Sequence, residues 1–276
     1  MNRGTFSGDI AEIEFVKLFN TEKESNRFKE YIDQFDSYNI NDIYMVRVTT
    51  KQYSKLSNQN VMTRADTFLI ESSDLKMNKV LSENNYYLDE DILKNHSISY
   101  TPINYSGISV KMSDSSRFQI LKLTPDSFYK LFKEYELGAA ASIYCQKEEE
   151  LSKNDMVCAG WHTSKQEIIN KYCKELPSLN CLLNKDLSKF DEIIIYKELK
   201  WFSNNRIAEI IDNDKYLQEI IFNGYHIYEE PYSAGYFYKG DTIKKLNYIP
   251  FWVTTGSGRS KGNFTIVLKP KNETIQ

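Results

Sequence analysis

Hydrophobic residues recur at helical spacing near the N-terminus of this chain. Over residues 8–19 they form one face, made of Ile10, Ile13, Val16 and Leu18. This is the repeat expected of an amphipathic helix. A helical pattern resumes over residues 24–35, so the sequence predicts a second helix there.

Short apolar runs then indicate strands. They cover residues 42–48, 67–70, 108–112 and 118–123. The polar stretch 113–116 is expected to join the last two strands. Residues 72–106 are polar and irregular, which predicts a long insertion between strands.

Two clear helix starts follow these strands in the sequence. Thr124-Pro125-Asp126 supplies a capping hydroxyl, a proline at the first helical position and an acid, and predicts a helix over 124–135. Ser164 and Glu167 form a capping-box pattern for the next helix. A helical pattern follows over 190–222, with breaks expected at 204–205 and 212–214. Strands at 251–253 and 263–268 flank a loop.

This order of elements favours an α/β or α+β fold with a mixed central sheet flanked by helices. The chain has 276 residues, enough for one large domain or two small ones. A soft boundary falls near residue 150, which would divide the chain into residues 1–150, with the insertion at 72–106, and residues 151–276.

Composition and net charge bear on where the protein is located and what it can bind. No run of about 18 apolar residues suggests a membrane span, and the first residues lack the apolar stretch of a signal peptide. We expect a cytoplasmic protein. The formal net charge is -3, so any surface that binds nucleic acid must be a local basic patch.

The most informative polar residues lie on neighbouring predicted strands. Asp66 opens the strand 67–70, and Ser109 and Lys111 alternate along the strand 108–112. Because side chains two apart on a strand face the same way, Ser109 and Lys111 share a face. A carboxylate for a cation and a lysine for a phosphate are the groups that a metal-dependent phosphodiesterase needs. The plainer alternative is a solvated acid at a strand end and a surface lysine.

Further carboxylates could complete such a site. Glu12 lies beside the apolar face of the first helix, where it could reach the edge of the sheet. Glu71 lies five residues after Asp66, so on a regular strand it points to the opposite face, and we expect it to be structural.

These residues resemble the PD-(D/E)XK nucleases, in particular type II restriction endonucleases of the HpaII and MspI kind. Asp66 resembles the acid that opens one core strand, and Gly107-Ile108-Ser109-Val110-Lys111 resembles the element in which Ser replaces the usual acid. Arg117 belongs to a following segment that is similar in kind, and the resemblance implies that it contacts DNA. The chain departs from the pattern at Ala65, where a proline is common, and the resemblance covers residues 8–135.

The resemblance implies a Mg²⁺-dependent endonuclease acting on double-stranded DNA, with a nuclease core in residues 1–150. It implies Asp66 and Glu12 as metal ligands, Ser109 as a supporting group and Lys111 as the residue that orients water or stabilises the phosphate. A DNA methyltransferase of the same restriction-modification system is the implied functional partner, and a homodimer is a possible assembly.

The loop between the C-terminal strands has the composition of a DNA-contacting loop. Its candidate residues are Ser257, Arg259, Ser260 and Lys261. Arginine can pair with guanine or phosphate, and lysine adds charge. We therefore expect residues 151–276 to supply DNA readout; the alternative is an ordinary hairpin turn.

Cysteine and histidine residues give weaker signals. Cys158, His162, Cys173 and Cys181 have the ligand types of a zinc site, but their spacings are irregular and no tight pair occurs. Reduced thiols are the simpler expectation. Two other functions stay open: a non-catalytic DNA-binding or defence-associated protein with a nuclease-like fold, and a cysteine hydrolase.

Overall fold

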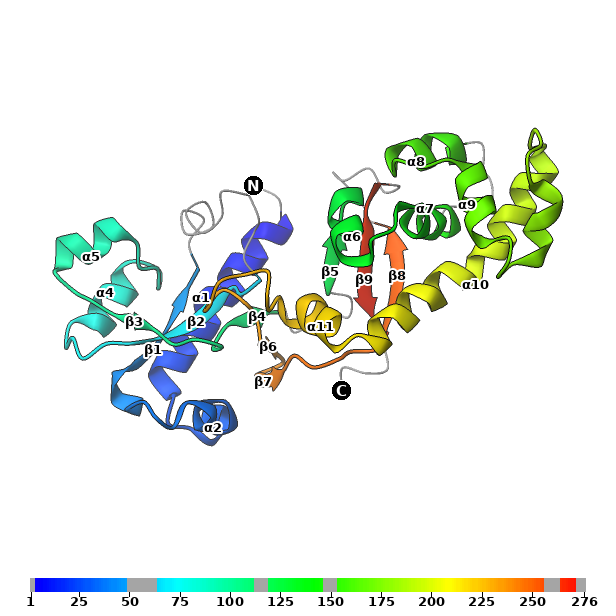
Figure 1. The fold of residues 1–276 in the computed structure, drawn as a ribbon. Coiled ribbons are helices and arrows are strands. Elements are labelled where there is room, and N and C mark those ends of the chain that lie inside the picture. The colour runs from blue at the N-terminus through cyan, green and yellow to red at the C-terminus, as the bar shows by residue number, and fades with distance from the viewer. Residues whose placement is uncertain (1–2, 49–63, 112–118, 146–152, 256–263, 272–276) are drawn as a thin grey trace. The chain divides into compact units, whose positions relative to one another are not determined.

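The structure is a computed structural model that describes residues 3–48, 64–111, 119–145, 153–255 and 264–271. It is an α+β protein with a mixed sheet and a second, smaller sheet (Figure 1). The chain divides into two compact units. The first comprises residues 1–116 and 219–248, and the second comprises residues 117–218 and 249–276.

The first unit is built on the mixed sheet, whose strand order is β1-β2-β4-β6-β7, with β3 paired to β2. The strands are β1 (Ile43–Arg47), β2 (Thr67–Glu71), β3 (Thr101–Pro102), β4 (Ile108–Val110), β6 (Tyr236–Lys239) and β7 (Thr242–Lys245). The β4–β6 pair is parallel and the other pairs are antiparallel. The sheet thus joins two segments that are far apart in the sequence.

Both faces of β1 and β2 are covered. Ile43, Met45 and Leu69 belong to one buried cluster, together with Phe15 and Phe19 of α1 (Arg3–Glu22) and residues of α2 (Asn26–Ile32). Their neighbours Tyr44, Val46, Phe68 and Ile70 belong to a second cluster with Met77, Val80 and Leu81 of α4 (Met77–Glu83) and residues of α5 (Glu90–His96). The alternation of the two clusters follows the two-residue period of a strand.

The second unit contains an antiparallel sheet in the order β5-β9-β8 and most of the longer helices. Its strands are β5 (Leu121–Leu123), β8 (Phe251–Thr255) and β9 (Ile266–Pro270). Its helices are α6 (Pro125–Phe132), α7 (Tyr135–Tyr144), α8 (Asn154–Gly160), α9 (Lys165–Tyr172), α10 (Lys189–Asn213) and α11 (Lys215–Gln218). Trp161, which is fully buried, lies directly against Gly138 of α7, where a Cβ atom would be 2.2 Å from the indole ring.

Local signals gave the correct elements in many places. The α+β class with a mixed sheet flanked by helices is confirmed. So are the first helix, the strand at β1 and the helix start at Thr124, whose hydroxyl accepts a hydrogen bond from Ser127 N (3.4 Å). Ser164 likewise caps α9 by accepting from Glu167 N (3.2 Å).

Other expectations were wrong. Residues 72–106 are not irregular, since they form α4, α5 and β3 and cover one face of the sheet. The strands β4 and β5 do not form a hairpin, because they pair in different sheets. Helix α10 continues through 204–205 without a break, although it does end at Asn213.

Strands β6 and β7 were missed, although the sequence carries a signal for them. Gly240 and Asp241 join them, and both have positive φ angles (55° and 64°). Such a pair is typical of a two-residue hairpin turn. Because β6 pairs with β4, this late segment belongs to the first unit, and the two units are interleaved along the chain rather than divided near residue 150.

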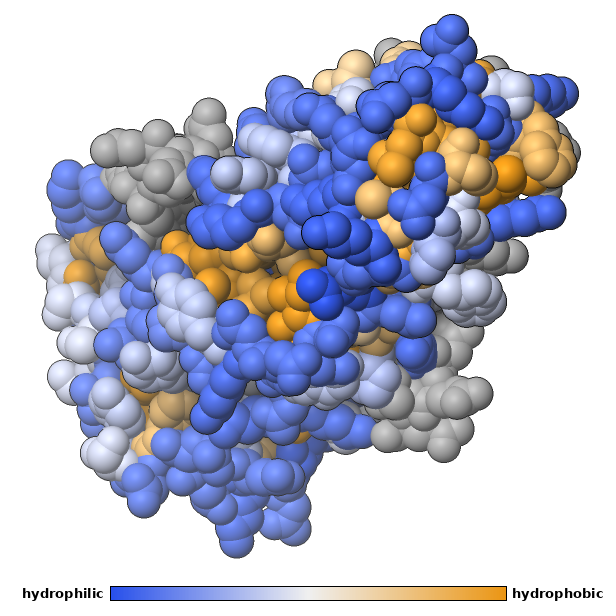
Figure 2. All heavy atoms as spheres, turned by 45° about the vertical axis from the view of Figure 1, so that its right-hand side comes forward, coloured by the Kyte–Doolittle hydropathy of each residue, from blue (hydrophilic) through white to orange (hydrophobic). Residues whose placement is uncertain are grey.

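The exposed surface is mostly hydrophilic on the face shown in Figure 2, with several hydrophobic patches. Large apolar side chains that remain exposed include Phe190, Trp201 and Trp252. Within the described residues, no helix has the length and apolar character to cross a membrane.

Candidate functional site

Asp66 is held where three strands meet. Its backbone N–H donates to Ile108 O on β4 (2.9 Å), and its carbonyl accepts from Val48 N just beyond β1 (3.0 Å). The residue is half-buried. This position directs its carboxylate toward β4, where Oδ2 accepts hydrogen bonds from Ser109 Oγ (3.0 Å) and Val110 N (2.7 Å).

Ser109 and Lys111 share one face of the sheet, as the sequence predicted. Lys111 Nζ donates to Ser109 Oγ at 2.7 Å. The Ser109 hydroxyl therefore connects the lysine to the carboxylate of Asp66. Burial lowers the pKa of Lys111, with Arg64 acting in the same direction and Asp66 and Glu12 opposing it.

Glu12 of α1 joins this group. The pKa of its carboxyl is raised from 4.5 to about 7, first by burial and then by the charge of Asp66, while hydrogen bonding to Arg47 acts the other way. The expected association of Glu12, Asp66, Ser109 and Lys111 is thus present. We refer to these four residues as the acid–lysine cluster.

Two arginines next to the cluster were not anticipated. Arg47, at the end of β1, is only 2% exposed and donates to Glu12 Oε2 through Nη2 (2.9 Å) and Nε (3.2 Å). Arg64 lies near Asp66 and Lys111, and its guanidinium donates to the carbonyls of Ile221 (2.9 Å) and Phe222 (3.3 Å). An arginine inside the apolar run 43–48 was a visible anomaly, because a buried guanidinium requires acidic partners.

The cluster offers oxygen donors suited to magnesium. Within the part of the chain that the structure describes, the contacts of the Asp66 and Glu12 carboxylates are made through Oδ2 and Oε2. The second oxygen of each could face a cation. Mg²⁺ is often bound through one or two carboxylates, with water and substrate phosphate as the remaining ligands. The residues present therefore fit this ion.

A site with more protein ligands is not found. Among the described residues, no group of three or more His, Cys, Asp or Glu side chains could hold a metal ion. The residues considered for zinc, Cys158, His162, Cys173 and Cys181, form no such group. Cys158 is buried, and burial raises its thiol pKa to about 12.

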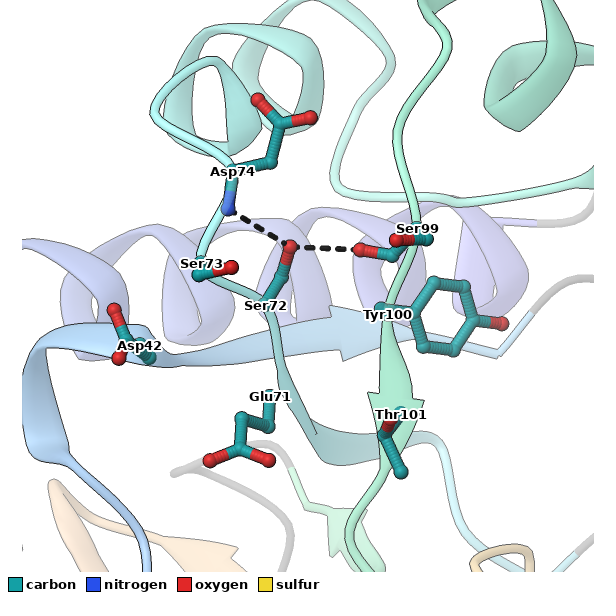
Figure 3. Close-up of a pocket in the computed structure, with 8 residues that line it drawn as sticks. All are labelled: Asp42, Glu71, Ser72, Ser73, Asp74, Ser99, Tyr100 and Thr101. Atoms are coloured by element: carbon teal, nitrogen blue, oxygen red, sulfur yellow. Dashed lines mark hydrogen bonds between the residues drawn. The ribbon is translucent and has the colours of Figure 1, made fainter.

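Glu71 lies apart from the cluster. It lines a pocket of about 570 Å³ together with Asp42, Asp74 and a run of serine, tyrosine and threonine side chains (Figure 3). Ser72 Oγ donates to Ser99 O (2.7 Å) at this pocket. Glu71 is at the opposite end of β2 from Asp66.

The expected DNA-contacting residues Arg117, Ser257, Arg259, Ser260 and Lys261 lie outside the described residues. Their roles stay predictions. Comparison with known proteins adds no relationship: no protein-family model matches the chain, and no curated protein has a matching sequence.

Proposed function

We propose that this chain is a Mg²⁺-dependent DNA endonuclease with a PD-(D/E)XK-like site, similar in its motif to type II restriction endonucleases. The observation that supports the proposal is the continuous series from Asp66 through Ser109 to Lys111, with contacts of 3.0 and 2.7 Å. Glu12 lies beside it as a second acid. An acid pair next to a half-buried lysine suits phosphodiester hydrolysis better than the other chemistries considered.

Glu12 and Asp66 would hold the cation, which when bound would supply positive charge to the phosphate and acidity to a water molecule. Lys111 would stabilise negative charge that develops on the phosphate. Ser109 contributes by fixing the position of Nζ. Because burial lowers the pKa of Lys111, its ammonium is a stronger acid and a stronger hydrogen-bond donor than an exposed lysine.

In this proposal the substrate is double-stranded DNA, and the loop at 254–262 takes part in its recognition. A methyltransferase that protects the same sequence would be the functional partner, and two copies of the chain could act together on the two strands. The substrate, the functional partner and the assembly are proposed because the motif resembles that of restriction endonucleases.

The test is cleavage of supercoiled plasmids of known and varied sequence. The wild-type chain is expected to nick or linearise DNA with Mg²⁺ and to be inactive with EDTA. Lys111→Ala should lose this activity, whereas Lys245→Ala, at an exposed lysine of β7, should retain it. No Mg²⁺-dependent cleavage of any plasmid would reject the proposal.

A second candidate is a non-catalytic DNA-binding protein with the same fold. The neutral Ser109, at the position where related motifs usually carry an acid, favours it, because the site then holds one metal-binding carboxylate fewer. Sequence-selective binding of plasmid fragments without cleavage in Mg²⁺ or Mn²⁺ would support this function instead.

A further inference from the structure

Arg47 makes an unusual set of contacts for a residue at the end of the outermost strand of the sheet, β1. Its guanidinium binds Glu12 through two nitrogens and also forms an ion pair with Asp9, one turn earlier on α1. The Arg47 side chain is 1% exposed, whereas the Asp9 and Glu12 side chains are 54% and 25% exposed. The buried guanidinium of Arg47 thus pairs with two more exposed acids on α1.

Two further contacts hold Arg47 in position. Arg47 N donates to Tyr86 O (2.8 Å), and the guanidinium carbon lies 4.3 Å from the centre of the Tyr87 ring. A flat cation stacked on an aromatic ring keeps its planar array of donors in one orientation. The donors therefore hold Glu12 at one place relative to the sheet.

Folding alone gives little reason for such a residue. Burying an ion pair costs desolvation free energy, and apolar side chains of similar volume often stabilise a core as well or better. Yet every other residue of β1 is apolar or aromatic. Arg47 instead binds Glu12, a carboxyl whose pKa is raised by burial and by the charge of Asp66.

We propose that Arg47 is a positioning residue that holds Glu12 in place to bind a divalent cation together with Asp66. This inference rests on the proposed function only in assuming that the acid–lysine cluster binds such a cation. Arg47 binds Oε2 of Glu12, and Oε1 would be the oxygen that binds the cation. Asp9 and Tyr87 keep the guanidinium from turning away.

The test is Mn²⁺ binding by isothermal titration calorimetry, with the full chain and no DNA. Removing a group that orients a metal ligand typically costs about 10–100-fold in affinity, and we expect the Mn²⁺ Kd of Arg47→Lys to rise by that amount. Lysine keeps the charge but cannot bind Glu12 through two nitrogens while stacking on Tyr87. Arg206→Lys is the matched control, since Arg206 forms an exposed ion pair with Glu209 (3.0 Å), and its Kd should equal that of the wild type.

A second variant guards against misfolding of the first. Asp9 is exposed, so Asp9→Asn should fold normally, and it is expected to raise the Kd in the same direction by a smaller factor. Circular dichroism melts would confirm folding of each variant. The proposal is overturned if folded Arg47→Lys and Asp9→Asn both bind Mn²⁺ as tightly as the wild type, or if the wild type binds none.

The test of Arg47 by Mn²⁺ binding can fail or succeed independently of the test of the proposed function by DNA cleavage. Mn²⁺ binding that depends on Asp66 and weakens in Arg47→Lys, in a chain that cleaves no DNA, would support the role of Arg47 and reject the nuclease. Cleavage with an unchanged Mn²⁺ Kd in Arg47→Lys would do the reverse.

Discussion

Two carboxylates, one in each unit, show how differently the units use charge. Glu12 in the first unit and Asp191 in the second each pair with a basic side chain, Arg47 and Lys185 respectively. Nevertheless the pKa of Glu12 is raised to about 7, whereas that of Asp191 is lowered to about 2. The pairing partner therefore does not explain the difference.

The full set of neighbours of each carboxyl explains the difference in pKa. Asp191 completes the capping box of α10: it accepts hydrogen bonds from Lys185 Nζ (2.9 Å) and from the backbone N and hydroxyl of Ser188 (both 2.8 Å). Each of these bonds favours the charged form. Glu12 is desolvated and faces a second acid, Asp66. Charge in the second unit secures a helix end, whereas acids in the first unit are crowded together, as expected for a site that binds a cation.

The largest difference in cleavage rate is expected between two variants that each remove one acid, one from each unit. Losing a metal ligand or a charge-stabilising group costs about 10²-fold or more in rate, and we expect Asp66→Ala to lose at least that much plasmid cleavage. Asp191→Asn should leave the rate per folded molecule unchanged. Initial rates with purified, folded variants decide the matter; near-normal cleavage by Asp66→Ala would contradict a catalytic site at β2.

The raised pKa of Glu12 predicts a pH effect on stability in the absence of divalent cations. A carboxyl whose pKa is higher in the folded state stabilises folding below its unfolded pKa of 4.5, and this contribution is lost as the pH rises through about 7. Relative to Glu12→Gln, the wild type should therefore lose on the order of a few kcal/mol of stability between about pH 5 and about pH 8.

Urea unfolding in EDTA at the two pH values would measure this change. Glu14→Gln is a matched control on the exposed side of the same helix and should change the stability difference less. A difference between wild type and Glu12→Gln that does not vary with pH would show that Glu12 is neither desolvated nor crowded by Asp66 in solution.

A milder effect is expected at Ser109. Its hydroxyl bonds two charged groups, Asp66 and Lys111, and such hydrogen bonds are each worth about 1.5–3 kcal/mol. A neutral hydroxyl nevertheless contributes less to binding a divalent cation than a carboxylate does. Ser109→Ala should therefore slow cleavage clearly less than Asp66→Ala does. Equal losses in two variants that both fold would mean that Ser109 acts on the cation or the substrate directly.

The smallest effect is expected for the capping box. A carboxyl with a lowered folded pKa stabilises the protein above its unfolded pKa of 3.8, and this contribution is lost as the pH falls through about 2. Asp191→Asn should thus lower the Tm at neutral pH and approach the wild type near the acid limit. Thermal melts followed by circular dichroism would show this, and an equal Tm deficit at both pH values would contradict it.

The sequence by itself determined the local features of this protein. Helix starts at Thr124 and Ser164 were readable because a cap and the residues it bonds lie within three positions of each other. The shared face of Ser109 and Lys111 was readable because side-chain direction alternates along a strand. Asp66 was correctly assigned next to them because it opens the neighbouring apolar strand.

Only the tertiary structure decided which distant segments meet. Pairing of β4 with β6 joins residues 108–110 to residues 236–238, and no periodicity within either segment specifies that partner. Arg47 stood out as a charge in an apolar strand, but its acids come from α1, more than thirty positions earlier. The crowding of Glu12 against Asp66 likewise depends on how α1 packs on the sheet, because local pattern sets the direction of a side chain and long-range packing sets what it faces.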